Sequence, residues 1–175
     1  MAPEPFDPDT YDASVADRAS LRSIMSCDLV CARRDLEITA IVGLMMKYRV
    51  GCIPVVDERH RPIGMITKFD LVEQLDAAMR SSCGGYSLPL DLAAQTADDV
   101  MMPIALTLEE NATIAHAAAM MTTEETHHVL VVNRDGTLVG VISTADIAAW
   151  VMQNDAVPVR HHASCGPPVW HPLEG

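Results

Sequence analysis

The sequence predicts a mixed α/β (α+β) fold that is built from two copies of one β-α-β-β-α unit. Three observations lead to this prediction. The chain has 175 residues, of which 49% are hydrophobic, enough to bury a core. It aligns with itself without a gap at an offset of 76 residues, which places Met25 on Met101 and Asp70 on Asp146. Helix-like and strand-like hydrophobic patterns then occur in the same order in both copies.

The first helix of each copy is predicted from apolar residues at helical spacing. An apolar stripe of this kind is typical of a helix that packs one face against a core. The stripe consists of Ile38, Ile41, Val42 and Met45 in the first copy and of Ile114, Ala117, Ala118 and Met121 in the second.

Two apolar strands and a second helix follow in each copy. The strands are expected at 52–56 and 63–67, and again at 128–132 and 139–143. The turn between the second pair contains Asp135-Gly136, which is typical of a tight hairpin. One such unit is too small to bury both faces of its sheet. We therefore expect the two copies to pack sheet against sheet about a pseudo-two-fold axis.

The repeat divides the chain into five segments. We expect repeat 1 at 19–79 and repeat 2 at 96–153. A linker is expected at 80–95, where Gly and Pro break the regular pattern. A flexible acidic tail is predicted at 1–18 and a second tail at 154–175.

Composition argues against several classes of function. The formal charge of −12 would repel the phosphates of nucleic acid. No apolar run is long enough to cross a bilayer, and the first residues are prolines and acids rather than a signal peptide. A cytoplasmic protein without nucleic-acid or membrane partners is expected. The five cysteines are odd in number and form no CxxC, which favours reduced thiols.

The two copies resemble a tandem pair of CBS domains, also called a Bateman module. The resemblance rests on the paired segments 64–70 and 140–146, on the strand motif 53–57 and on the segment 98–103, and it covers about residues 20–153. It implies a site for an adenosine-containing ligand between the repeats: AMP, ADP or ATP, and less readily S-adenosylmethionine or NAD(H). It also implies a homodimer that regulates a partner protein by conformational change.

The sequences Thr67-x-x-Asp70 and Ser143-x-x-Asp146 have two interpretations. Each is a capping box, in which the hydroxyl and the acid satisfy free amides at a helix start. A helix start is also an anion site, because its free amides and dipole attract phosphate. The resemblance implies that Asp70 and Asp146 bind ribose. It places Thr67, Ser143 and Thr144 near phosphate, with Lys68 as an added cation beside Thr67.

An adenine base would need an apolar slot, and two histidines match phosphate-contacting positions of the family. The candidates for the slot, each of which could equally be plain core, are Ile53, Pro54, Val129, Val30 and Leu106. His127 and His128 are adjacent in a strand, so at most one faces a given cleft. They could also be ordinary surface or hydrogen-bonded histidines. The first copy has Gly51-Cys52 at the equivalent positions, so the two sites are expected to be unequal.

Catalysis and metal binding are not expected. The chain has no P-loop, no GxSxG and no HExxH sequence. No spacing of its histidines and cysteines matches a four-ligand zinc site. The sequence therefore predicts a stand-alone regulatory module that binds an adenosine compound and has no cofactor. The alternative is an adaptor or scaffold that binds no nucleotide and acts through protein contacts.

Overall fold

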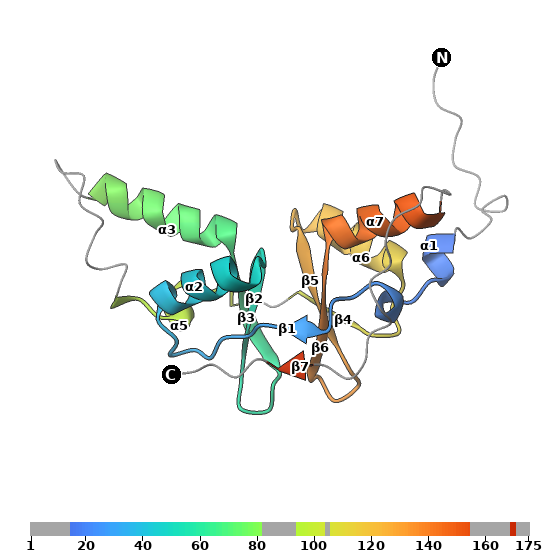
Figure 1. Cartoon of the computed structure of the whole chain (residues 1–175), viewed down its shortest axis with the longest axis horizontal. Helices are drawn as coiled ribbons and strands as arrows, with labels where there is room; N and C mark the ends of the chain where they lie inside the picture. The colour runs from blue at the N-terminus through green and yellow to red at the C-terminus, as the bar shows by residue number, and fades with distance from the viewer. Residues whose placement is uncertain (1–14, 82–93, 104–105, 155–168, 171–175) are drawn as a thin grey trace, which may run out of the picture.

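The structure, a computed structural model, describes residues 15–81, 94–103, 106–154 and 169–170. Two repeats lie side by side, with their hairpins facing each other at the centre and their helices on the outside (Figure 1). The predicted linker 80–95 and the tails 1–18 and 154–175 fall largely outside the described residues.

Repeat 1 contains the predicted elements in the predicted order. They are β1 (Asp28–Leu29), α2 (Ile38–Tyr48), β2 (Cys52–Val56), β3 (Pro62–Thr67) and α3 (Lys68–Ser81). The stripe on α2 is buried at Ile38, Ile41 and Met45, as its spacing predicts, whereas Val42 is 41% exposed. The α2 helix ends at Arg49, whose left-handed backbone (φ 56°) lets its N–H donate to the Met45 carbonyl.

Repeat 2 has the same order of elements, but its first strand is part of its sheet, whereas β1 is not part of the β2–β3 sheet of repeat 1. The elements of repeat 2 are β4 (Thr107–Glu109), α6 (Ile114–Thr123), β5 (His128–Val132), β6 (Leu138–Ser143) and α7 (Thr144–Asn154). The strand β4 pairs in parallel with β5, and β5 pairs antiparallel with β6 in the same way as β2 with β3. The predicted α/β fold of two β-α-β-β-α repeats is therefore confirmed.

Each repeat is completed by the segment that leads into the other one. We call residues 20–27 and 96–102 the lead-in segments. The first includes the 3₁₀ helix η2 (Leu21–Ser23), and its Leu21 and Met25 are buried in the core of repeat 2. The second includes the short helix α5 (Ala97–Val100), and Ala97 and Val100 are buried in the core of repeat 1. The two repeats are therefore interlocked.

A third apolar cluster joins the two sheets. It contains Leu29, Cys52 and Met65 from repeat 1 together with Leu130 and Leu138 from repeat 2. Because burial of apolar side chains is the main stabilising term in folding, this cluster holds the repeats in a defined orientation. The predicted sheet-against-sheet packing has this cluster as its core.

Two short elements lie in segments that were predicted as tails. The helix α1 (Val15–Arg18) contacts α6, and β7 (Val169–Trp170) pairs in parallel with β1. The α3 helix runs to Ser81, inside the predicted linker.

The prediction that all the cysteine thiols are reduced is wrong for Cys27, which is disulfide-bonded. Cys31 and Cys52 are free and buried. In the described residues, no helix is both long and apolar enough to span a membrane.

Candidate functional site

The two predicted capping boxes are present and have the same geometry. Asp70 Oδ2 accepts hydrogen bonds from the Thr67 N–H (2.6 Å) and the Thr67 hydroxyl (2.8 Å), and the Asp70 N–H donates back to that hydroxyl (3.3 Å). Asp146 Oδ2 accepts from the Ser143 N–H (2.7 Å) and hydroxyl (2.6 Å) in the same way. Both acids are half-buried. Each therefore keeps a second carboxylate oxygen without a capping partner.

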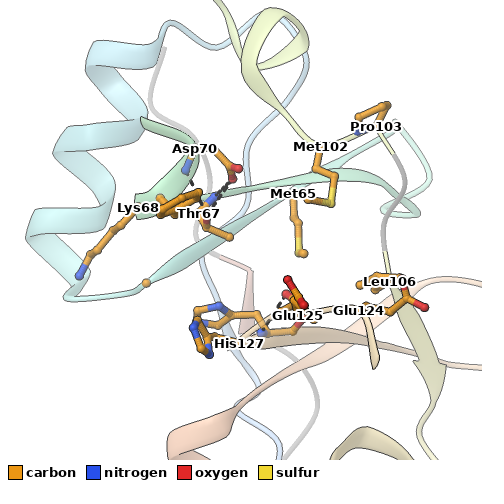
Figure 2. Close-up of a pocket in the computed structure, with 14 residues that line it drawn as sticks. Met65, Thr67, Lys68, Asp70, Met102, Pro103, Leu106, Glu124, Glu125 and His127 are labelled. Carbon is orange, nitrogen blue, oxygen red and sulfur yellow. Dashed lines mark hydrogen bonds between the residues drawn. The ribbon is translucent and has the colours of Figure 1, made fainter. Parts of the chain in front are cut away.

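The first box opens onto the larger cavity, which we call the Asp70 cavity. Its volume is about 790 Å³, within the range of roughly 300–1,000 Å³ that is usual for small-molecule sites. Figure 2 shows the capping box on one side and His127, Glu124, Glu125 and Leu106 on the other. The cavity is thus formed by both repeats together.

The second box opens onto a smaller cavity, which we call the Asp146 cavity. Its volume is about 260 Å³. Ser143 and Asp146 of repeat 2 line it together with Val30, Pro54 and Arg49 of repeat 1. The two cavities are related by the repeat, but they differ threefold in size. The two cavities are therefore unequal in size, and the expectation that the two ligand sites are unequal stays a prediction.

The charges that line the two cavities also differ. Arg49 lies in the Asp146 cavity at the left-handed residue that follows α2 (φ 56°). At the equivalent position after α6, the left-handed residue is Glu125 (φ 51°), which lines the Asp70 cavity. The repeat therefore places opposite charges at matching points of the two cavities.

His128 lies in the wall between the cavities and lines both of them. It begins β5, directly opposite Ser143 in the strand register. Burial lowers the pKa of His128 below its ordinary value, and His127 lowers it further, whereas Asp146 raises it. His128 is therefore a neutral imidazole at pH 7. His127 is exposed and lines the Asp70 cavity but not the Asp146 cavity.

The structure brings most of the predicted site residues to these cavities. Thr67, Lys68, Asp70, Leu106, His127 and His128 line the Asp70 cavity, and Val30, Pro54, Ser143 and Asp146 line the smaller one with His128. Thr144 lines a third, open cavity of about 530 Å³ beside His127. Ile53 and Val129 are fully buried in the cores of repeats 1 and 2 and line none of these three cavities.

Several cavity residues were not predicted from the sequence. Arg49 and Glu125 are the most informative, because their charges distinguish the two cavities. The self-alignment pairs Arg49 with Glu125, two residues ahead of the paired positions Gly51 and His127. Their role depends on the left-handed turn after the first helix, which no local sequence signal marks. The described residues contain no group of three or more His, Cys, Asp or Glu arranged to hold a metal ion.

Comparison with known proteins identifies this pair of repeats. The family model "CBS domain" matches residues 21–77 and again 97–153. The chain belongs to the CBS domain family. Hypoxic response protein 1 of Mycobacterium tuberculosis is 25% identical over 146 residues, which cover 83% of this chain and 94% of the relative.

Solved structures of CBS pairs share the fold. CBSX2 in complex with AMP aligns with a TM-score of 0.65 and 19% identity, over 78% of this chain and 98% of that chain. The CBS pair of protein MJ0100, in complex with 5-methylthioadenosine and S-adenosyl-L-methionine, gives a TM-score of 0.66 at 20% identity, over 78% and 98%. Hypoxic response protein I with two coordinated zinc ions aligns with a TM-score of 0.62 and 27% identity, over 75% of this chain and 98% of that chain.

Other CBS relatives are longer than this chain. The chain spans 11% of the inosine-5'-monophosphate dehydrogenase of Methanocaldococcus jannaschii, to which it is 37% identical over 54 residues. It spans 58% of the uncharacterized protein MK0525 of Methanopyrus kandleri, at 26% identity over 123 residues. The match to the enzyme covers only a small part of its length.

Proposed function

We propose that this CBS pair is a regulatory module that binds an adenine nucleotide in the Asp70 cavity and acts through a partner protein in the cytoplasm. The observation that carries the proposal is that the cavity combines a capped helix start with walls from both repeats. Thr67 and Asp70 come from repeat 1, whereas Leu106 and His127 come from repeat 2. A ligand that touches both repeats can favour one relative orientation of them.

The chemistry of the cavity suits a nucleoside phosphate. The free oxygen of Asp70 can accept a hydrogen bond from a ribose hydroxyl, as expected for this family. The α3 helix begins at Lys68, so the positive end of its dipole lies at the cavity, and the Lys68 side chain adds a positive charge there. Leu106 and Met65 provide apolar surface for a base. The CBSX2 structure contains AMP and the MJ0100 structure contains adenosyl compounds, which supports an adenosine ligand here.

A homodimer is part of the proposal. Large apolar side chains are exposed on the outer helices: Met46 (72%) on α2, Phe69 (67%) and Val72 (59%) on α3, and Met152 (47%) on α7. Exposed apolar patches commonly mark protein contacts. Sedimentation at several concentrations would test this point, and a monomer throughout would contradict it.

No catalytic step is assigned to the module. In the described residues, the repeated acids are tied to helix starts by their hydrogen bonds rather than paired with each other across a cavity. The relatives that are enzymes match this chain over a small part of their length, 11% for the dehydrogenase and 22% for an L-aspartate semialdehyde sulfurtransferase.

Thermal unfolding in the presence of AMP, ADP, ATP, S-adenosylmethionine and NADH tests the proposal. A ligand at about 100 times its dissociation constant adds roughly 2.7 kcal/mol to the stability of the protein that binds it. For a chain of this size that raises the melting temperature by about 5–11 °C. A folded protein that shows no shift with any of the five compounds would favour the adaptor instead.

Two variants separate ligand binding from helix capping. Asp70→Ala removes a cap and a cavity acid, so it should lower stability by about 0.5–2 kcal/mol and also abolish nucleotide binding in the Asp70 cavity. Asp99→Ala is the matched control. Asp99 forms an equivalent capping box with Thr96, with two hydrogen bonds of 2.8 Å, and lines none of the three cavities. This variant should lose stability and keep its affinity for AMP. Wild-type affinity for AMP in both variants would refute a role for Asp70 in binding.

A further inference from the structure

One side chain connects the two cavities. Among the described residues, His128 and Gly51 line both the Asp70 cavity and the Asp146 cavity. The His128 ring lies against Gly51, so closely that a Cβ atom at position 51 would be 3.1 Å from Nε2 and 3.3 Å from Cε1. The absence of a side chain at Gly51 therefore lets the imidazole reach the wall between the repeats.

This contact joins the two capped helix starts. On one side, His128 faces Ser143 in the strand register, and Ser143 caps α7 with Asp146. On the other side, the Gly51 carbonyl accepts a hydrogen bond of 3.1 Å from the N–H of Lys68, the first residue of α3. A charge on the His128 ring would therefore be close to both capped helix starts.

The two repeats are not equivalent at this point. The self-alignment places Cys52 on His128, and Cys52 lines only the Asp146 cavity of the two. Burial raises the pKa of the Cys52 thiol to about 12, so this position carries no charge at pH 7. Among the described residues, the hydrogen bonds of His128 involve only its backbone and Thr126. The His128 ring nitrogens are thus available to take up a proton.

We propose that His128 is a proton-binding residue shared by the two cavities. An anionic ligand in the Asp70 cavity is bound together with a proton on His128. The imidazolium then also faces the Asp146 cavity and favours an anion there. This inference rests on the proposed function, since it concerns how the nucleotide site is regulated.

The surroundings of the His128 ring determine how a bound anion changes its pKa. His128 is neutral at pH 7 because it is partly buried and lies beside His127 and Lys68. A phosphate nearby stabilises the charged form and raises the pKa. The other charged groups that line the two cavities are Asp28, Arg49, Asp70, Glu124, Glu125 and Asp146. The carboxylates among them favour the protonated form of His128, whereas the positive charge of Arg49 opposes it.

Calorimetric titration with AMP at pH 7.5, in Tris and in HEPES, measures proton uptake directly. Wild-type protein should take up at most one proton per chain, and its affinity should rise as the pH falls, by up to about tenfold per pH unit. His128→Gln should lose this proton uptake. The matched control is His127→Gln, which removes the neighbouring histidine, a residue that does not line the Asp146 cavity, and should retain the proton uptake. Adenosine, which has no phosphate, should bind to wild-type protein without proton uptake.

The ionisation of AMP itself contributes equally to the proton uptake measured for wild type and for the variants under the same conditions, so it cancels when they are compared. Equal proton uptake in wild type and His128→Gln would overturn the coupling and leave the nucleotide site intact. No AMP binding by wild-type protein would overturn the proposed function and the coupling together. Imidazole NMR signals provide a test on unaltered protein. AMP at pH 7 should move the His128 signals toward those of an imidazolium, and unchanged signals at saturation would refute the proposal.

Discussion

Gly64→Ala tests whether the lead-in segments hold the two repeats together. Gly64 lies in β3, where the lead-in segment 96–102 crosses it. A Cβ atom at Gly64 would be 2.6 Å from Met101 Sδ and 2.7 Å from the carbonyl oxygen of Met102. The flexible sulfur can move away. The carbonyl cannot move as easily, because it accepts the N–H of Met65 (3.2 Å) and the Met102 N–H donates to the Met65 carbonyl (3.0 Å).

The size of the effect follows from this contact. Relief of the overlap requires the segment to move off β3, which loosens Ala97 and Val100 in the core of repeat 1. Overpacking of this kind typically costs about 1–3 kcal/mol. For a chain of this length, the melting temperature should fall by about 2–12 °C.

Gly43→Ala is the matched control. Gly43 lies in the middle of α2, is exposed, and a Cβ atom there would meet nothing within 4 Å. Alanine in a helix is favoured over glycine by roughly 0.5–1 kcal/mol. In thermal and urea unfolding followed by circular dichroism, Gly43→Ala should therefore be more stable than wild type and Gly64→Ala less stable. Gly64→Ala with wild-type stability would refute the view that the lead-in segment is fixed against β3.

Two further predictions concern titration and reactivity. The N–H groups of Arg61 and Arg59, each 2.8 Å from Asp57 Oδ1, keep the pKa of Asp57 below its usual 3.8. A depressed pKa stabilises the fold above the unfolded pKa, and this stability is lost as the pH falls through the folded pKa. Asp57→Asn should therefore weaken the pH dependence of the free energy of unfolding below about pH 4. Urea denaturation measures this free energy, and an unchanged pH dependence would contradict the prediction. Burial raises the pKa of Cys31 and Cys52 to about 12, so a thiol reagent at about pH 8 should label both only after unfolding. Mass spectrometry of native protein with either cysteine labelled would disprove it.

Much of the fold was predictable because its signals are local and occur twice. The strands expected at 52–56 and 128–132 match β2 and β5 to the residue. The capping boxes were predictable as well, since a hydroxyl and an acid at three-residue spacing form their hydrogen bonds within one turn. The same local reasoning could not predict that Ile53 and its neighbour Pro54 have different surroundings. Both are buried in β2, yet Pro54 lines a cavity and Ile53 does not.

The sequence by itself determined the repeat, its helices and strands, and the two capped helix starts, because each depends on spacing within a few residues. The tertiary structure decided which residues share a cavity. It placed Leu21 and Met25 in the core of repeat 2, and Ala97 and Val100 in that of repeat 1. It also placed His128 against Gly51, between the cavities. These contacts join residues far apart in the chain, and they depend on how two similar sheets pack, which no local pattern encodes.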